Sequence, residues 1–190
     1  MLPRSVYDAF NPLARARYWE YANGEFFGNG FDAWWCDCTE PLDADWRPMS
    51  EGYGWDSHEE RWKGNLALLD GVLGAERSSL FSLYHSKGLY ENQRATTDRK
   101  RVVNLTRSSY AGQQRYSTIT WNGDTHASWK SFAQQIPQGL NFMATGCPYW
   151  TVDIGSFFTR KGREWFRAGD FDAGVDDMGY REYYVRMLQY

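Results

Sequence analysis

The stretch Phe31-Asp-Ala-Trp-Trp-Cys36 is a short apolar run that follows the glycines Gly24, Gly28 and Gly30. Short apolar runs bounded by glycines are typical of buried strands in parallel sheets. The residue after this run is Asp37. The sequence therefore predicts a buried strand over residues 31–36 that ends on a carboxylate.

Helical and strand-like segments alternate on both sides of this stretch. Strands are predicted over residues 31–36, 102–105, 117–121 and 149–152, and helices over 11–23, 79–96, 129–144 and 180–189. Asn11-Pro12 has the form of an N-cap followed by a first-turn proline, whereas Pro137 predicts a kink or break inside a helix. Residues 41–65 are expected to form a long loop, and residues 159–179 are charged and rich in glycine.

Alternating strands and helices predict right-handed βαβ units around a parallel sheet, which is an α/β architecture. About four βα units fit into the 190 residues of the chain. A complete eight-stranded (β/α)8 TIM barrel needs about 250 residues. The architecture expected at this point is part of such a barrel or a small open sheet.

A polar residue of catalytic type follows each predicted strand: Asp37, Arg107, Asp124 and Asp153. In a parallel sheet these four residues share the face at the carboxyl ends of the strands, where active sites of α/β proteins lie. Any one aspartate taken alone is explained equally well as a helix cap. A set of carboxylates around one arginine costs repulsion that capping does not require, which favours a site.

Paired carboxylates beside aromatic rings suggest glycoside hydrolysis. The chain has ten Trp, thirteen Tyr and eleven Phe, which serve either an aromatic core or a cleft for sugar rings. One carboxylate must attack or stabilise the sugar carbon while the other donates a proton to the leaving oxygen. We expect Asp37, near Arg107, to act as the carboxylate and Asp124, beside Trp121, to hold the proton.

Four ordered motifs resemble glycoside hydrolase family 31. Gly30-Phe-Asp-Ala-Trp-Trp-Cys-Asp-Cys-Thr-Glu-Pro41 is similar to the family's nucleophile segment at the end of the fourth barrel strand. The other similar segments are Thr106-Arg-Ser-Ser-Tyr-Ala-Gly-Gln-Gln-Arg-Tyr116, Trp121-Asn-Gly-Asp124, and the stretches 139–142, 146–150, 153–157 and 181–186. The resemblance implies that residues 1–190 are a single segment of the barrel, strands four to seven, without the first strands and the last.

The resemblance also implies roles for individual residues. Asp37 corresponds to the nucleophile and Asp124 to the acid/base. The sugar-binding subsite would be shaped by Trp35, Cys38, Arg107, Trp121, Asp153 and Phe157. Cys38 is equally well read as a small packing residue. Glu40 would have a supporting role. The family uses no metal and no cofactor and retains the anomeric configuration, so the two carboxylates are expected about 5 to 5.5 Å apart.

The function implied by the resemblance is that of a retaining α-glycosidase, which removes terminal non-reducing α-linked glucose or xylose from oligosaccharides through a covalent glycosyl-aspartate. The Trp-Cys-Asp-Cys-Thr-Glu-Pro form of the nucleophile segment favours family members that act on α-xylosides. Two alternatives stay open: a carbohydrate-binding fragment without turnover, because the missing strands complete the subsite, and an α-transglycosylase that uses the same two aspartates.

Composition narrows the range of partners. The net charge is −3, and the basic run at residues 98–101 reads as a solvated helix end, so nucleic acid is not expected as a partner. No apolar stretch reaches the 18 residues of a membrane span, and residues 1–6 lack a signal-peptide pattern. The chain thus reads as soluble, and its full-length parent is cytoplasmic or exported. Half a barrel would leave two open sheet edges, through which self-association is expected.

The remaining candidate ligands do not predict a metal centre. His58, His85 and His126 are widely separated in the sequence, and His126 attracts interest only because it follows Asp124 by two residues. The three cysteines cannot all pair with one another, and we expect them to be reduced.

Overall fold

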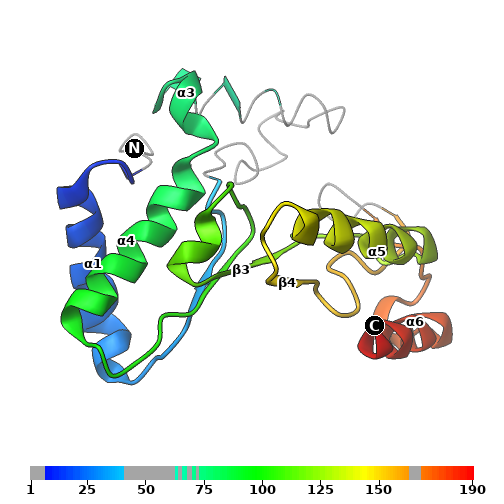
Figure 1. The fold of residues 1–190 in the computed structure, drawn as a ribbon. Helices are drawn as coiled ribbons and strands as arrows, with labels where there is room; N and C mark the ends of the chain where they lie inside the picture. Colours follow the sequence, from blue (N-terminus) through cyan, green and yellow to red (C-terminus); the bar gives the residue numbers. More distant parts are fainter. Residues whose placement is uncertain (1–6, 41–62, 64–65, 68–69, 72, 163–167) are drawn as a thin grey trace, which may run out of the picture. The chain divides into compact units, whose positions relative to one another are not determined.

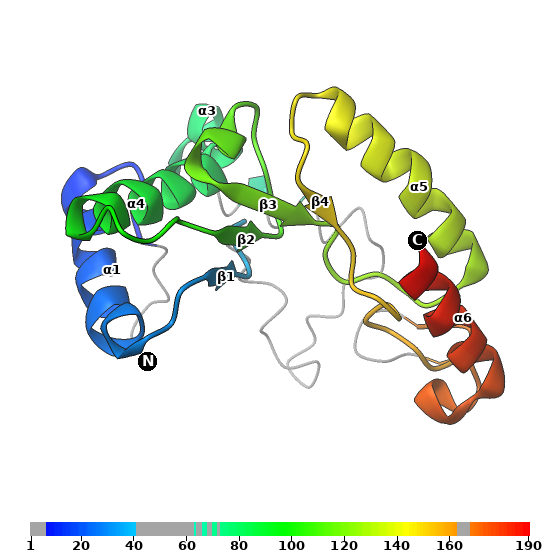
Figure 2. The same cartoon turned by 60° about the horizontal axis from the view of Figure 1, so that its bottom comes forward.

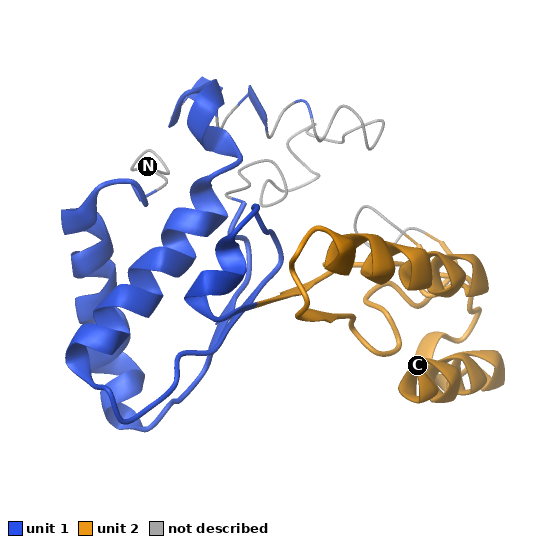
Figure 3. Ribbon diagram, in the orientation of Figure 1, with its two compact units in different colours: residues 1–118 blue, residues 119–190 orange. Residues whose placement is uncertain are grey.

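The computed structural model describes residues 7–40, 63, 66–67, 70–71, 73–162 and 168–190. The chain divides into two compact units, residues 1–118 and 119–190 (Figure 3). Of the loop predicted over 41–65, only position 63 lies within the described residues, and 163–167 of the Gly-rich segment also lie outside them. Within the described residues, no helix is both long and apolar enough to cross a membrane.

Unit 1 begins with helix α1, which lies beside helix α4 (Figure 1). The elements of this unit are α1 (Pro12–Glu25), η1 (Phe27–Asn29), β1 (Trp34–Cys36), α3 (Ala75–Ser78), α4 (Phe81–Thr96), β2 (Asn104–Thr106) and η4 (Gln113–Tyr116). The predicted cap is confirmed, since the Asn11 side chain accepts a hydrogen bond from the Leu13 amide at 2.9 Å. The helix continues through Gly24, which the sequence placed after its end.

A small residue lets α1 and α4 approach each other closely. A Cβ atom added at Gly88 of α4 would lie 2.8 Å from Cδ of Arg15 on α1. Arg15 is buried, and its Nη1 donates to the carbonyl oxygens of Ala9 at 2.9 Å and Phe10 at 3.0 Å. The buried guanidinium is therefore satisfied by the backbone that precedes the helix.

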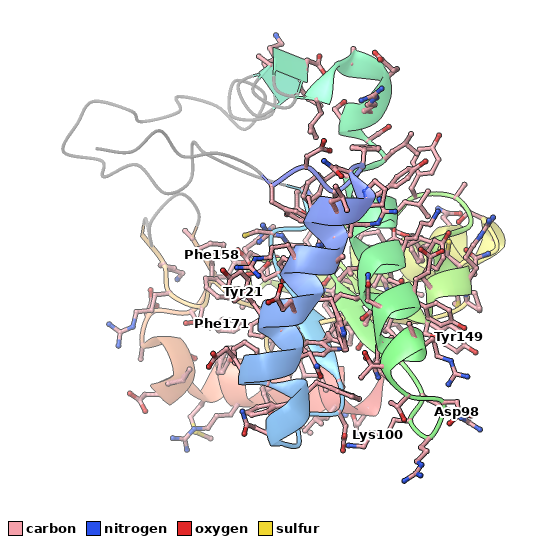
Figure 4. All side chains as sticks on the ribbon, turned by 90° about the vertical axis from the view of Figure 1, so that its left-hand side faces the viewer. Tyr21, Asp98, Lys100, Tyr149, Phe158 and Phe171 are labelled. Carbon is pink, nitrogen blue, oxygen red and sulfur yellow. The ribbon has the colours of Figure 1, made fainter. Side chains whose placement is uncertain are left out.

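Strands β1 and β2 form a parallel pair in which Trp34 aligns with Asn104 and Cys36 with Thr106; they run side by side in Figure 2. The observed β1 is shorter than the predicted strand because Gly30 adopts a left-handed φ of 98° and the amide of residue 31 turns back to the Phe26 carbonyl. Just before β1, Asp32 pairs with Lys100, which is labelled in Figure 4.

One face of β1 packs against the helices. Trp34 and Cys36 lie against the cluster of Trp19, Ala22 and Leu89 from α1 and α4. The indole nitrogen of Trp34 also donates to Gln93 on α4 at 2.8 Å. Side chains alternate along a strand, so Trp35 points to the other face, and 71% of it is exposed.

Unit 2 contains a second parallel pair with its own core. Its elements are β3 (Thr118–Trp121), whose first residue still belongs to unit 1, α5 (Trp129–Ala144), β4 (Trp150–Thr151), η5 (Gly174–Asp176) and α6 (Met178–Gln189). Trp121 aligns with Thr151 in the β3–β4 pair. The core of the unit consists of Ala127, Phe171, Tyr180, Tyr183 and Met187.

Helix α5 runs unbroken through Pro137. Ser128 caps its first turn by accepting from the Ser131 amide at 3.0 Å. Gly139 lies against the strand, because a Cβ atom there would come within 2.8 Å of the Trp150 indole nitrogen. Ring contacts near its two ends, Trp129 with Tyr183 and Phe142 with Trp150, also hold the helix in place. The cap and these contacts offset the hydrogen bond that proline removes.

Both strand pairs are parallel, and a helix lies between the members of each pair in the chain, α4 in the first and α5 in the second. This pattern confirms the predicted α/β class.

Candidate active site

Asp37 and Arg107 meet because of the register of β1 and β2. Cys36 and Thr106 are partners across the parallel pair, so the residues that follow them leave the sheet at the same edge. Arg107 Nη1 lies 3.2 Å from Asp37 Oδ1. The Arg107 side chain is 14% exposed and that of Asp37 is 44% exposed. The carboxylate predicted as nucleophile therefore faces solvent with a more deeply buried cation behind it.

Cys38 forms the turn that follows. It adopts a left-handed backbone with φ of 52°, and its amide donates to Asp37 Oδ1 at 2.7 Å. Arg107 Nη2 donates to the Cys38 sulfur at 3.2 Å. Burial raises the pKa of the Cys38 thiol to about 11, against the opposing effect of Arg107. At neutral pH the sulfur is a protonated thiol that accepts a hydrogen bond, rather than a nucleophilic thiolate.

Glu40 makes the closest ion pair of Arg107. Its Oε1 lies 2.5 Å from Arg107 Nε, and its side chain is 19% exposed. Burial raises the pKa of the Glu40 carboxyl, while the positive charge of Arg107 acts in the opposite direction. Burial also disfavours the charged guanidinium, but Glu40, Cys38 and Asp37 outweigh this effect and raise the pKa of Arg107. Arg107 is thus held as a cation among three acceptors.

A buried network of hydrogen bonds fixes the segment after β2. Gln113 is fully buried, and its Nε2 donates to Ser82 Oγ at 2.8 Å and Ser86 Oγ at 3.1 Å on α4. It also approaches the carbonyl oxygen of Ser108 at 3.3 Å. The hydroxyl groups of Ser108 and Thr39 lie 2.9 Å apart, which joins this segment to the one after β1. The backbone beside Arg107 is therefore attached both to a helix and to the turn that carries Asp37.

In unit 2, Asp124 and Asp153 lie on two segments that the backbone joins. Asp124 follows β3 by three residues and Asp153 follows β4 by two. The carbonyl oxygen of Thr125 accepts from the amides of Phe157 at 2.9 Å and Phe158 at 3.0 Å. Both aspartates thus come after the carboxyl ends of paired parallel strands, as predicted.

The aromatic candidates of this unit differ in exposure. Trp121 is 3% exposed, whereas Phe157 is 53% exposed and makes an edge contact with Phe158 at a ring-centroid distance of 4.9 Å. The Phe157 ring is therefore exposed to solvent, whereas the Trp121 side chain is buried.

The histidines and cysteines are dispersed. His126 forms an isolated bridge with Phe158, His85 is buried in unit 1, and His58 lies outside the described residues. Among the described residues, no three His, Cys, Asp or Glu side chains are arranged to hold a metal ion. None of Cys36, Cys38 and Cys147, which all lie among the described residues, forms a disulfide.

Two features of the site were not anticipated from the sequence: Glu40 as the nearest carboxylate to Arg107, and the burial of Gln113. Glu40 is closer to Arg107 than Asp37 is, although the sequence assigned it only a supporting role. Gln113 was quoted only as part of the family-like segment 106–116, and its burial has no local signal, because a polar residue after a glycine in a connection normally indicates an exposed loop.

In many α/β proteins the active site lies at the carboxyl ends of parallel strands. The arginine–carboxylate cluster at this edge of β1 and β2 places the chain in that class. Within this class the chain belongs to glycosyl hydrolase family 31: the model of the Glycosyl hydrolases family 31 TIM-barrel domain matches residues 3–190. The family resemblance and the partial TIM barrel predicted from the sequence are confirmed.

Similar proteins include α-xylosidases. The chain is 36% identical over 185 residues to an alpha-xylosidase of Saccharolobus solfataricus, a match that covers 96% of this chain and 22% of that protein. It is 32% identical over 192 residues to Alpha-xylosidase A of Aspergillus niger, covering 96% of this chain and 25% of that protein. The chain thus spans about a quarter of these relatives or less.

The solved structures show the same likeness. A crystal structure of a GH31 alpha-xylosidase from Xanthomonas citri superposes with a TM-score of 0.73 at 30% identity, over 97% of this chain and 18% of that chain. Among the sequence relatives, an alpha-glucosidase of Saccharolobus solfataricus is 27% identical over 164 residues, covering 80% of this chain and 23% of that protein. The likeness therefore extends to relatives named for either sugar.

Proposed function

We propose that this chain carries the catalytic face of a retaining α-glycosidase, as strands four to seven of the barrel, with Asp37 as nucleophile and Asp124 as acid/base. The observation that carries the proposal is the Asp37–Arg107 ion pair at the carboxyl ends of β1 and β2 in a family 31 chain. The substrate is an oligosaccharide with a terminal non-reducing α-linked xylose or glucose. Relatives named alpha-xylosidase favour xylose.

The proposed reaction has two displacements. The Asp37 carboxylate attacks the anomeric carbon, the bond from that carbon to the leaving oxygen breaks, and Asp124 gives its proton to that oxygen. Water then attacks the glycosyl-aspartate, Asp124 takes a proton from the water, and the bond to Asp37 breaks. Two inversions at one carbon leave the anomeric configuration unchanged.

The remaining candidates would form the subsite. Arg107 would offset the negative charge of Asp37 through their ion pair, and the Cys38 amide would hold the same carboxylate by its hydrogen bond. Trp35 and Phe157 are exposed aromatic side chains suited to stacking on a pyranose, and Asp153 would accept hydrogen bonds from sugar hydroxyl groups. Trp121 is buried at the end of β3, and it would help to fix the position of the segment that carries Asp124.

Turnover of aryl α-xyloside and α-glucoside tests the assignment. Asp37→Ala and Asp124→Ala are expected to lower kcat/KM on the order of a thousandfold or more. Asp32→Ala is the matched control, since Asp32 is an exposed carboxylate of the same unit that pairs with Lys100, and it should retain turnover. Turnover that survives the loss of Asp37 would refute its role as nucleophile.

Added azide separates the two roles. In Asp37→Ala, azide replaces the missing nucleophile and should give a glycosyl azide of inverted configuration. In Asp124→Ala, azide attacks the intact glycosyl-aspartate and should give the retained configuration. A parent chain that binds xylose without turnover would instead support a carbohydrate-binding fragment, and transfer to an added sugar in preference to water would support a transglycosylase.

A further inference from the structure

Arg107 uses each of its three guanidinium nitrogens on a different partner. Nε contacts Glu40 Oε1 at 2.5 Å, Nη1 lies 3.2 Å from Asp37 Oδ1, and Nη2 lies 3.2 Å from the Cys38 sulfur. We propose that Glu40 is a positioning residue, which anchors the Nε edge of Arg107 and so directs its terminal nitrogens at Asp37 and Cys38. The catalytic value of this arrangement rests on the proposed function, whereas the anchoring itself does not.

The geometry of the guanidinium makes one anchor sufficient. Its N–H groups form a planar, rigid fork at the end of a flexible side chain. Fixing the Nε edge therefore fixes the plane and the direction of both terminal nitrogens. The contact to Glu40 is the shortest of the three, and charge-assisted hydrogen bonds of this kind are about twice as strong as neutral ones.

Glu40 and Asp37, the two carboxylates that pair with Arg107, differ in burial. Glu40 and Arg107 are 19% and 14% exposed at their side chains, whereas Asp37 is 44% exposed. An ion pair is stronger where less water screens it. The Glu40–Arg107 pair is thus the stable part of the cluster, and Asp37 is the carboxylate that a ligand can reach.

The segments after β1 and β2 are also joined without the Glu40–Arg107 pair. This second link makes it possible to tell positioning of Arg107 from general support of the fold. Thr39 and Ser108 are joined by their hydroxyl groups at 2.9 Å, and Gln113 ties the Ser108 carbonyl to α4. The Ser108 side chain also hydrogen-bonds Glu40, but the Gln113 bond goes to the Ser108 carbonyl oxygen and Thr39 offers the Ser108 hydroxyl a second partner. These bonds should hold the segments together when the Glu40 charge is removed. The expected effect of that change is a loosened guanidinium inside an intact unit.

The test measures hydrogen exchange at the Arg107 Nε–H group by ¹⁵N NMR of the full 190-residue chain. Arg107→Lys assigns the resonance, because it removes that group. Glu40→Gln keeps the shape of the side chain and one acceptor oxygen but loses the charge. It should speed exchange at Arg107 Nε–H by roughly tenfold or more, the equivalent of losing one hydrogen bond between charged groups.

Two references show whether the effect is local. The Trp34 indole N–H, bonded to Gln93 in the same unit, reports opening of the unit as a whole and should exchange at its parent rate. Glu20→Gln is the matched control, since Glu20 pairs with Arg17 on the surface of α1, and it should leave Arg107 unchanged. Glu40→Asp keeps the charge on a shorter side chain and should restore part of the protection.

The outcomes separate positioning from the proposed function. Unchanged Arg107 exchange in Glu40→Gln, or equal acceleration at Trp34, would overturn the proposal. If Glu40→Gln does not fold, Glu40→Asp is compared with the parent: its shorter side chain should still speed Arg107 exchange, though by less than about tenfold, and an unchanged rate would overturn the proposal. Turnover by the parent should fall about tenfold in Glu40→Gln. A parent without turnover whose Arg107 responds as expected refutes the catalytic role alone. A parent with turnover whose Arg107 does not respond refutes the positioning role alone.

Discussion

At the scale of single residues, Arg107 is the member of the cluster with the largest consequence for stability. Arg107→Ala removes the partner of Glu40, whose carboxylate stays largely buried. Leaving one charge of a buried pair without its partner costs about 3 to 5 kcal/mol. We expect a loss of about 3 kcal/mol, the lower end of this range, because both side chains keep some exposure. Urea unfolding measures it.

Arg17→Ala provides the control for this prediction. Arg17 also pairs with a glutamate, Glu20, but their side chains are 59% and 63% exposed. Exposed pairs contribute little to stability, because water and salt screen the two charges, so Arg17→Ala should leave the urea midpoint nearly unchanged. A loss of equal size in the two variants would contradict the view that burial makes the Arg107 cluster strong.

His85 makes the stability of unit 1 depend on pH. It is buried among the rings of Tyr18 and Phe81, and Tyr7 Oη lies 3.1 Å from its Nδ1. Burial lowers the pKa of His85 from 6.5 to about 4. Between these values the unfolded chain binds a proton that the folded chain does not, so stability rises with pH. The contribution is fully present above pH 6.5 and is lost as the pH falls towards 4.

His85→Gln should remove this part of the pH dependence. The parent chain is expected to lose on the order of 3 kcal/mol between pH 6.5 and 4 through His85, and the variant should lose correspondingly less. Urea unfolding at several pH values in this window makes the comparison. Parallel curves for the two proteins would show that His85 is protonated in the folded state.

The residue scale also shows how much of the site the sequence could predict. The Asp37–Arg107 contact followed from one assumption, that two neighbouring strands are parallel and in register, and the assumption holds. The sequence did not predict which of its three partners Arg107 contacts most closely. It depends on a left-handed turn at Cys38, which an L-residue rarely adopts and which a strand pattern does not encode.

At the scale of elements, the close packing of α5 on β4 depends on a glycine. A Cβ atom at Gly139 would lie 2.8 Å from the indole nitrogen and 2.9 Å from Cδ1 of Trp150. Gly139→Ala should therefore destabilise the chain, even though alanine favours a helix over glycine by about 1 kcal/mol. We expect a net loss of about 1 to 3 kcal/mol, as for other overpacked sites, measured by urea unfolding.

Gly24→Ala in α1 is the matched change, because a Cβ atom there meets nothing within 4 Å. It should raise stability by up to about 1 kcal/mol. Stabilisation by both substitutions would mean that Trp150 moves away at little cost.

The same comparison explains which element boundaries were predictable. The start of α1 was predicted correctly because Asn11 and Pro12 are local signals for a helix start. The start of β1 was not, because residues 31–33 have the composition of a strand but are turned aside after Gly30. Helix ends depend on neighbours in the chain, whereas strand ends depend on a partner that is distant in sequence.

At the scale of the whole molecule, the outer edge of β1 bears on self-association. In a parallel pair, alternate residues bond to the same neighbour. The Trp34 amide donates to the Val103 carbonyl at 2.9 Å, so the amide of residue 33 points to the edge away from β2. A strand edge with outward-pointing backbone groups is a template for pairing with another chain. We expect the 190-residue chain to self-associate through this edge as its concentration rises.

Ala33→Pro tests this expectation without breaking the β1–β2 pair. Proline at residue 33 removes an amide that points outward and leaves the Trp34–Val103 bond in place. Sedimentation velocity over a concentration series should show weaker association for Ala33→Pro than for the parent. Ala33→Thr keeps the amide and should associate like the parent. Because neither substitution touches Asp37 or Arg107, association that persists unchanged in Ala33→Pro would assign it to a surface other than this strand edge.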